Sequence, residues 1–155
     1  MANLCLKTQK FAKVGYVFFY DDSLVSIELE KSVVKKANKD IKKKLKEDKV
    51  PLLQRAAEKE QAWEDFGESL SALSKDEILS QYREAISIDY RDIEKFKFTP
   101  YRKNVRTGGN DMETRDYLGE VSVKGKGDKI WYNHKYQKGD LKYDQAISIK
   151  ESLDL

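Results

Sequence analysis

The side chains that could carry out catalysis are few and scattered along the chain. The sequence contains one histidine, His134, and one cysteine, Cys5. A histidine base needs a nucleophile or an orienting group beside it, and a thiol becomes reactive only where its surroundings lower its pKa. No neighbouring motif supplies either condition. We therefore expect His134 to be a surface residue at the end of a strand, Cys5 to be a buried or inert thiol, and the protein not to be an enzyme.

Metal and phosphate motifs are also absent from the sequence. It contains no His/Cys cluster with zinc spacing, no EF-hand pattern and no P-loop. The glycines of 108–109 and 125–127 lack the strand–loop–helix context of a phosphate site, and Asp21-Asp22 is typical of a turn. We predict no catalytic residue, metal or cofactor. One cysteine allows no intramolecular disulfide, which fits a reducing compartment.

Charge segregation is the strongest physical signal. Charged residues make up 37% of the 155 residues, although the net charge is only +3. Nine lysines crowd residues 31–49, and a run of acidic residues follows between 58 and 68. If two helices pair antiparallel here, part of the lysine face could meet the acidic face, although such surface pairs stabilise by only about 0–1 kcal/mol each.

The alternative is that the lysine face binds phosphates of nucleic acid or an anionic membrane. The candidate residues are Lys35, Lys39, Lys42, Lys43 and Lys46. Because no arginine or aromatic residue is interleaved with them, we expect nucleic-acid binding, if present, to be independent of base sequence and steeply salt-dependent.

Two further surfaces could bind a partner. Arginine and tyrosine are enriched in interaction hot spots, and both occur between residues 101 and 117; the candidates are Arg102, Lys103, Arg106, Arg115 and Tyr101. This stretch could equally be a solvated hairpin loop. Trp63 and Phe66 lie on an apolar helix stripe that is more often core, but would form an interface if the helices project from the sheet.

The elements that must position these residues follow from periodicity. Residues 14–20 and 24–30 form a predicted hairpin, and residues 4–6 could add a strand. A helix is predicted from Ser32, a second from Pro51 to about Leu73, with Leu52 and Leu53 on its apolar stripe, and a third from Lys75 behind a Ser74–Glu77 capping box.

The second half of the chain returns to strands. Residues 86–98 alternate polar and apolar in two runs, with a bend expected at Arg91-Asp92. A loop of about 14 residues follows if nothing in it pairs. Strands are predicted at 116–124 and 129–134, and a terminal helix at 143–153.

Three pieces of the chain resemble bacterial pleckstrin-homology-like and GRAM-like domains. They are the hairpin Tyr16–Ile27, the segment Ile88–Phe96 and the pair of strands Leu118–Tyr132. The resemblance implies a bent antiparallel barrel or sandwich, capped by a C-terminal helix, that binds peptides, proteins or lipid headgroups and rarely catalyses. The basic lipid-binding signature between the first two strands has no match, so the resemblance implies no lipid site.

The sequence thus predicts an α+β, PH-like single domain over residues 1–155, with a helical insertion at 32–84. We expect a non-catalytic binding or assembly module that contacts a protein partner or a second copy of itself. Association with nucleic acid or an anionic membrane through residues 31–49 is the alternative. No apolar run approaches the roughly 20 residues of a transmembrane helix, and the start resembles no secretory signal. A cytoplasmic location is therefore expected.

Overall fold

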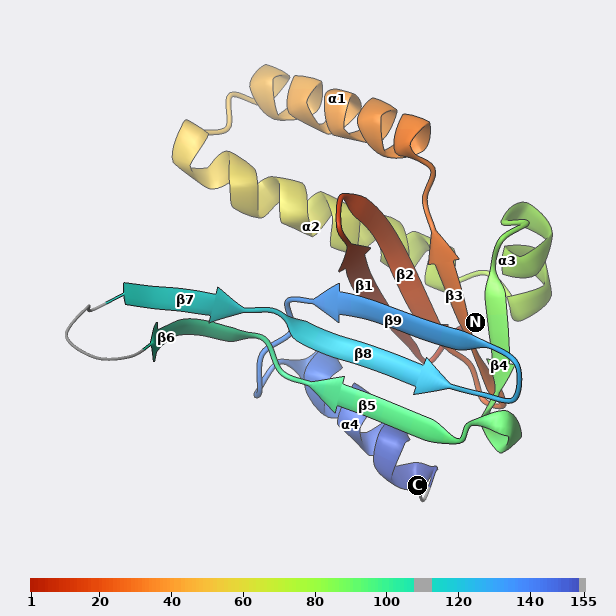
Figure 1. Ribbon diagram of the computed structural model, residues 1–155. Helices are drawn as coiled ribbons and strands as arrows, with labels where there is room; N and C mark the ends of the chain where they lie inside the picture. Colours follow the sequence, from red (N-terminus) through yellow and green to blue (C-terminus); the bar gives the residue numbers. More distant parts are fainter. Residues whose placement is uncertain (108–112, 154–155) are drawn as a thin grey trace.

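The computed structural model describes residues 1–107 and 113–153. The strands in this part are β1 (Leu4–Lys10), β2 (Lys13–Phe19), β3 (Ser23–Glu28), β4 (Ile86–Asp89), β5 (Lys95–Thr99), β6 (Arg102–Thr107), β7 (Glu113–Tyr117), β8 (Gly119–Lys124) and β9 (Lys129–His134). The helices are α1 (Lys31–Glu47), α2 (Leu52–Ser71), α3 (Lys75–Gln81), the 3₁₀ turn η1 (Tyr90–Asp92) and α4 (Leu141–Ser152). The predicted α+β class, the helical insertion between strands and the C-terminal helix are confirmed (Figure 1).

The main sheet has seven antiparallel strands in the order β4-β3-β2-β1-β9-β8-β5, and β6 pairs with β7 in a separate small sheet. The two halves of the main sheet join where β1 meets β9, through the single residue pair Gln9↔Asn133. Such limited pairing lets the halves turn toward each other, as Figure 1 shows. The sheet remains open, because β4 and β5 are its two edges. A closed barrel, one of the two predicted forms, is therefore not present.

Local sequence signals account for the turns. The backbone N–H of Tyr20 donates to the Ser23 carbonyl at 2.8 Å, which closes the predicted hairpin over Asp21-Asp22. The Ser74 side chain accepts from the Glu77 N–H at 3.2 Å and caps α3. The Asp89 carboxylate accepts from the Arg91 N–H and starts η1. The bend expected at Arg91-Asp92 is confirmed.

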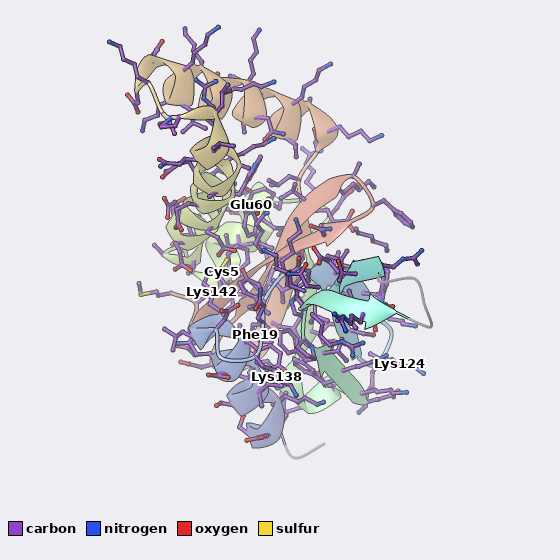
Figure 2. The ribbon with its side chains drawn as sticks, turned by 90° about the vertical axis from the view of Figure 1, so that its left-hand side faces the viewer. Cys5, Phe19, Glu60, Lys124, Lys138 and Lys142 are labelled. Atoms are coloured by element: carbon purple, nitrogen blue, oxygen red, sulfur yellow. The ribbon has the colours of Figure 1, made fainter. Side chains whose placement is uncertain are left out.

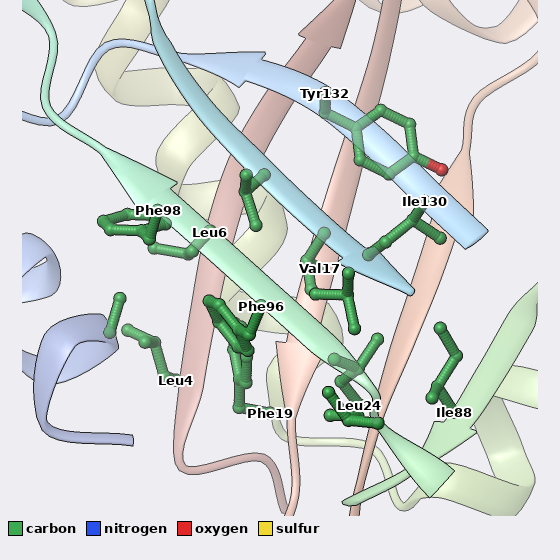
Figure 3. Packing of buried hydrophobic residues seen from close by; sticks show 14 of the residues in the cluster. Leu4, Leu6, Val17, Phe19, Leu24, Ile88, Phe96, Phe98, Ile130 and Tyr132 are labelled. Carbon is green, nitrogen blue, oxygen red and sulfur yellow. The ribbon is translucent and has the colours of Figure 1, made fainter. Parts of the chain in front are cut away.

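The concave side of the sheet holds one hydrophobic core (Figure 3). Leu6, Val17 and Phe19 from one half lie opposite Phe96 and Phe98 from the other. Alternation along each strand places these side chains on one face. Tyr143 and Ala146 of α4 complete this core, so the C-terminal helix covers its open side.

The convex side of the sheet holds a second core, covered by α2. Trp63, Gly67 and Leu70 of α2 are buried against Tyr16 and Cys5. The Tyr16 hydroxyl donates to the Trp63 carbonyl at 2.6 Å. Because both faces of β1, β2 and β3 are covered, these strands are buried along most of their length.

The stretch between β5 and β9 resolves one open expectation and corrects one predicted strand. The possible long loop after β5 contains paired strands, because Arg102–Thr107 and Glu113–Tyr117 form the β6–β7 hairpin; its residues 108–112 lie outside the described part. The strand predicted at 116–124 is split at Leu118, between β7 and β8. The chain therefore passes from the small sheet into the main sheet within one stretch of residues. The period-two pattern alone did not indicate where one strand ends and the next begins.

Candidate binding surfaces

The α1 helix forms an outer layer over α2 and carries the predicted lysines. None of its residues is fully buried, and only a narrow stripe with Val34, Ala37 and Ile41 packs inward. The five predicted lysines are all exposed; they are Lys35, Lys39, Lys42, Lys43 and Lys46. With Lys31 they follow helical spacing along one flank, a lysine stripe about 22 Å long from residue 31 to residue 46.

The predicted pairing of these lysines with the acidic face of α2 was wrong. In residues 1–107 and 113–153, no ion pair joins α1 to α2. Glu64 and Glu68 instead accept from Lys142 of α4 at 2.8 and 2.7 Å, and Glu60 pairs with Lys7 of β1. Glutamates at 60, 64 and 68 share one helix face, and that face turns toward the sheet and α4. Figure 2 shows Cys5, Glu60 and Lys142 along this side of the molecule.

The paired carboxylates belong to a partly buried polar network. The Tyr136 hydroxyl donates to Glu64 Oε1 at 2.8 Å and accepts from the Lys7 N–H at 2.7 Å. Burial alone would raise the pKa of the Glu60 carboxyl, but the hydrogen bond and charge of Lys7 outweigh it and lower this pKa. Burial would likewise lower the pKa of the Lys142 ammonium, yet its bonds to Glu64 and Glu68 raise it. The network ties α2 to β1 and α4.

Trp63 is core rather than interface. It is 4% exposed, and its indole N–H donates to Asn38 Oδ1 of α1 at 3.0 Å. Phe66 lies at the edge of the same core, 37% exposed, with its ring 6.0 Å from the rings of both Trp63 and Tyr16. The candidate interface through Trp63 is therefore wrong, because α2 packs on the sheet at this point. The helical insertion packs on the sheet around Trp63 and projects away from it at the α1–α2 connection.

The arginine-containing stretch forms the β6–β7 hairpin. Arg102, Lys103, Arg106 and Arg115 are exposed, and Tyr101 is partly buried. The Arg102 guanidinium lies 5.2 Å from the centre of the Tyr117 ring, and the Tyr101 hydroxyl donates to Asp116 at 2.9 Å. A backbone bond from Asn104, followed by the bond from Tyr101, lowers the pKa of Asp116.

The hairpin and the lysine stripe form separate surfaces. Figures 1 and 2 place the β6–β7 hairpin and α1 on different parts of the molecule. The cationic candidates therefore do not converge on one site.

His134 is buried, contrary to the surface position expected for it. It is 1% exposed, its ring stacks on Phe98 with centres 4.6 Å apart, and its Nδ1 accepts from the Tyr136 N–H at 3.0 Å. The alternation of β9 points Ile130, Tyr132 and His134 into the concave core. Burial lowers the pKa of His134 to about 4, so the ring is neutral at pH 7.

The remaining chemically active groups are enclosed. Cys5 is buried as expected, and burial raises the pKa of its thiol to about 12, so the thiol is protonated and a poor nucleophile. A cavity of about 40 Å³ beside Thr8 and His134 has room for little more than water. No three His, Cys, Asp or Glu side chains group into a possible metal site within the described residues.

A second and larger hollow is a groove at the sheet edge that sequence reasoning missed. It has a volume of about 550 Å³. One wall is the end of β3 and the start of α1, and the other is the connection from α3 to β4. We call it the edge groove; its lining residues are Ile27, Glu28, Leu29, Glu30, Val33, Gln81, Tyr82, Arg83, Glu84 and Ala85. Its two walls are about fifty residues apart in sequence, and no local pattern marks them as neighbours.

Comparisons with models of protein families, with curated proteins and with solved structures found no match to this chain. Among the helices of residues 1–107 and 113–153, none has the length and apolar character needed to cross a bilayer.

Proposed function

We propose that this chain is a non-catalytic, cytoplasmic binding module on a PH-like scaffold, and that it takes an extended segment of a partner protein in the edge groove. The observation that carries this proposal is the groove itself, because its volume of about 550 Å³ has room for several side chains. The PH-like assignment is supported by the bent antiparallel sheet and by the C-terminal helix over its concave core.

The backbone beside the groove supports an extended partner. The Leu29 N–H donates to the Val14 carbonyl at 2.8 Å, toward β2. Neighbouring residues of a strand alternate in direction, so the N–H and C=O of Glu28 point the other way, toward the β4 side. The β3–β4 ladder ends at Ser26↔Ile86. The backbone N–H and C=O of Glu28 can therefore hydrogen-bond to an added strand.

The side chains of the groove define the partner's chemistry. Leu29, Val33 and Ala85 contribute apolar surface, and three carboxylates on the rim outnumber the one guanidinium. The carboxylates are Glu28, Glu30 and Glu84, and the guanidinium is Arg83. We expect a segment that alternates apolar residues with lysine or arginine, because opposite charges across an interface favour association and exclude other partners.

Selection from a random heptapeptide phage library tests this proposal. We expect basic, alternating sequences to be enriched and to bind the purified chain in fluorescence anisotropy. Val33→Arg places a cation and a longer side chain in the groove, and should weaken binding of the best peptide at least about tenfold.

Leu141→Arg is the matched control, because Leu141 is also an exposed apolar residue in the first turn of a helix. It should leave the peptide affinity unchanged. Enrichment of acidic peptides, or equal affinity of the wild-type chain and the Val33→Arg variant, would show that the edge groove is not the site.

A further inference from the structure

The connection between α1 and α2 has an unusual apolar tip. Residues Val50-Pro51-Leu52-Leu53 form an apolar run, and Leu52 and Leu53 are 79% and 98% exposed. The predicted apolar stripe would turn both leucines inward, which is wrong. The first buried residue of α2 is Trp63, about 16 Å along the helix from Leu52. In Figure 1 this tip is the end of the helical hairpin farthest from the main sheet.

Cations outnumber the two acids, Glu47 and Asp48, at this tip. The lysine stripe of α1 runs toward it and ends at Lys46, and exposed Lys49 lies in the turn itself. The acidic face of α2 does not neutralise these charges, because Glu60, Glu64 and Glu68 pair with Lys7 and Lys142. The tip therefore presents two exposed leucines beside a cationic helix flank.

This combination favours one kind of partner. A nucleic-acid backbone needs only the cations and leaves the exposed leucines without a role. An anionic membrane uses both, because apolar side chains enter the acyl boundary while lysines lie at the charged headgroups. We infer that Leu52 and Leu53 insert into an anionic membrane surface while the lysine stripe of α1 contacts its headgroups.

This docking surface is separate from the edge groove, so the two proposals stand independently. The groove lies at the start of α1, and the tip lies beyond its other end. The chain would then rest on a membrane through the hairpin tip and leave the groove accessible to a partner segment.

Sedimentation with vesicles of phosphatidylcholine, with and without phosphatidylserine, tests the inference on the full chain. We expect binding only to vesicles that contain phosphatidylserine, and weaker binding at higher salt. The double variant Leu52→Ala/Leu53→Ala should lose at least about tenfold in affinity. Both leucines are exposed, so this variant should fold normally.

A four-lysine variant and its matched control separate the stripe from general charge. Replacing Lys35, Lys39, Lys42 and Lys46 by Gln should abolish vesicle binding. The control replaces four exposed lysines of the β5–β8–β9 edge by Gln, and so removes the same charge; they are Lys95, Lys124, Lys126 and Lys129. It should leave most vesicle binding intact. Equal loss in both sets would overturn the inference.

Direct insertion can be observed with Leu53→Trp. Its fluorescence should shift to the blue on vesicle addition and be quenched by lipids brominated on their acyl chains. Unchanged vesicle binding of the double leucine variant would overturn the inference. Binding of the wild-type chain to duplex DNA but not to vesicles would also overturn it. So would a double leucine variant that loses self-association, measured by light scattering, but binds vesicles as the wild-type chain does.

Discussion

The two long helices of the insertion carry opposite charges and have opposite roles. Both are rich in charge, yet α2 buries Trp63, Gly67 and Leu70 and pairs its glutamates with β1 and α4, whereas α1 buries no residue completely and has no ion pair to α2. The difference shows that a charged helix is held against the fold when residues of opposite charge lie on the neighbouring elements. The helix that receives no counter-ions remains available for a partner.

The largest effect should come from removing the anchor of α2. Trp63→Ala deletes a buried indole that touches the sheet and bonds to Asn38, and should cost about 3–5 kcal/mol in the free energy of unfolding. Urea denaturation measures this value. Phe66→Ala, at a partly exposed neighbouring position, should cost about 1 kcal/mol. Equal costs would mean that α2 is not anchored through Trp63.

Acid should destabilise the fold through His134. The pKa of this ring is about 4 in the folded chain, and about 6.5 in the unfolded chain. Protonation therefore favours unfolding: the stability is complete above pH 6.5 and falls as the pH drops toward 4, at a slope that approaches about 1.4 kcal/mol per pH unit. The total loss is about 3 kcal/mol by pH 4. Denaturation between pH 7 and pH 5 measures the slope.

His134→Asn supplies the control for this pH dependence. The amide oxygen can still accept from the Tyr136 N–H, but it does not titrate in this range. We expect a lower starting stability and a flatter profile between pH 6.5 and 5. A profile as steep as that of the wild-type chain would assign the titration to another group.

Weakening the polar network should have an intermediate effect. Glu64→Gln keeps the shape of the side chain but removes the charge that faces Lys142 and Tyr136, and should cost about 1–2 kcal/mol. Glu58→Gln, at an exposed position of the same helix, should change stability by less than about 0.5 kcal/mol. Urea denaturation of the pair tests whether the acids of α2 differ as their contacts indicate.

The smallest effect should come from the lysine stripe. Replacing Lys35, Lys39, Lys42 and Lys46 by Gln removes like charges at helical spacing, and should stabilise the fold slightly or leave it within about 0.5 kcal/mol. A loss above about 1 kcal/mol would show that these lysines do form stabilising pairs. The comparison between α1 and α2 would then fail.

The sequence determined the features that depend on neighbours along the chain. The hairpin over Asp21-Asp22, the cap at Ser74 and the bend at Arg91-Asp92 follow from period and turn chemistry, because those preferences act over a few residues. The segregation of lysines into one helix was also visible, since it is a property of composition. These features fixed the α+β class and the place of the insertion.

Only the tertiary structure decided which of these groups meet. Glu64 pairs with Lys142, which lies 78 positions away, and the edge groove joins two segments about fifty residues apart. His134 is buried because its face of β9 closes against Phe98, and Leu52 and Leu53 are exposed because α2 extends past the sheet. Such contacts depend on how distant elements pack, and the periodicity within one element carries no information about that packing.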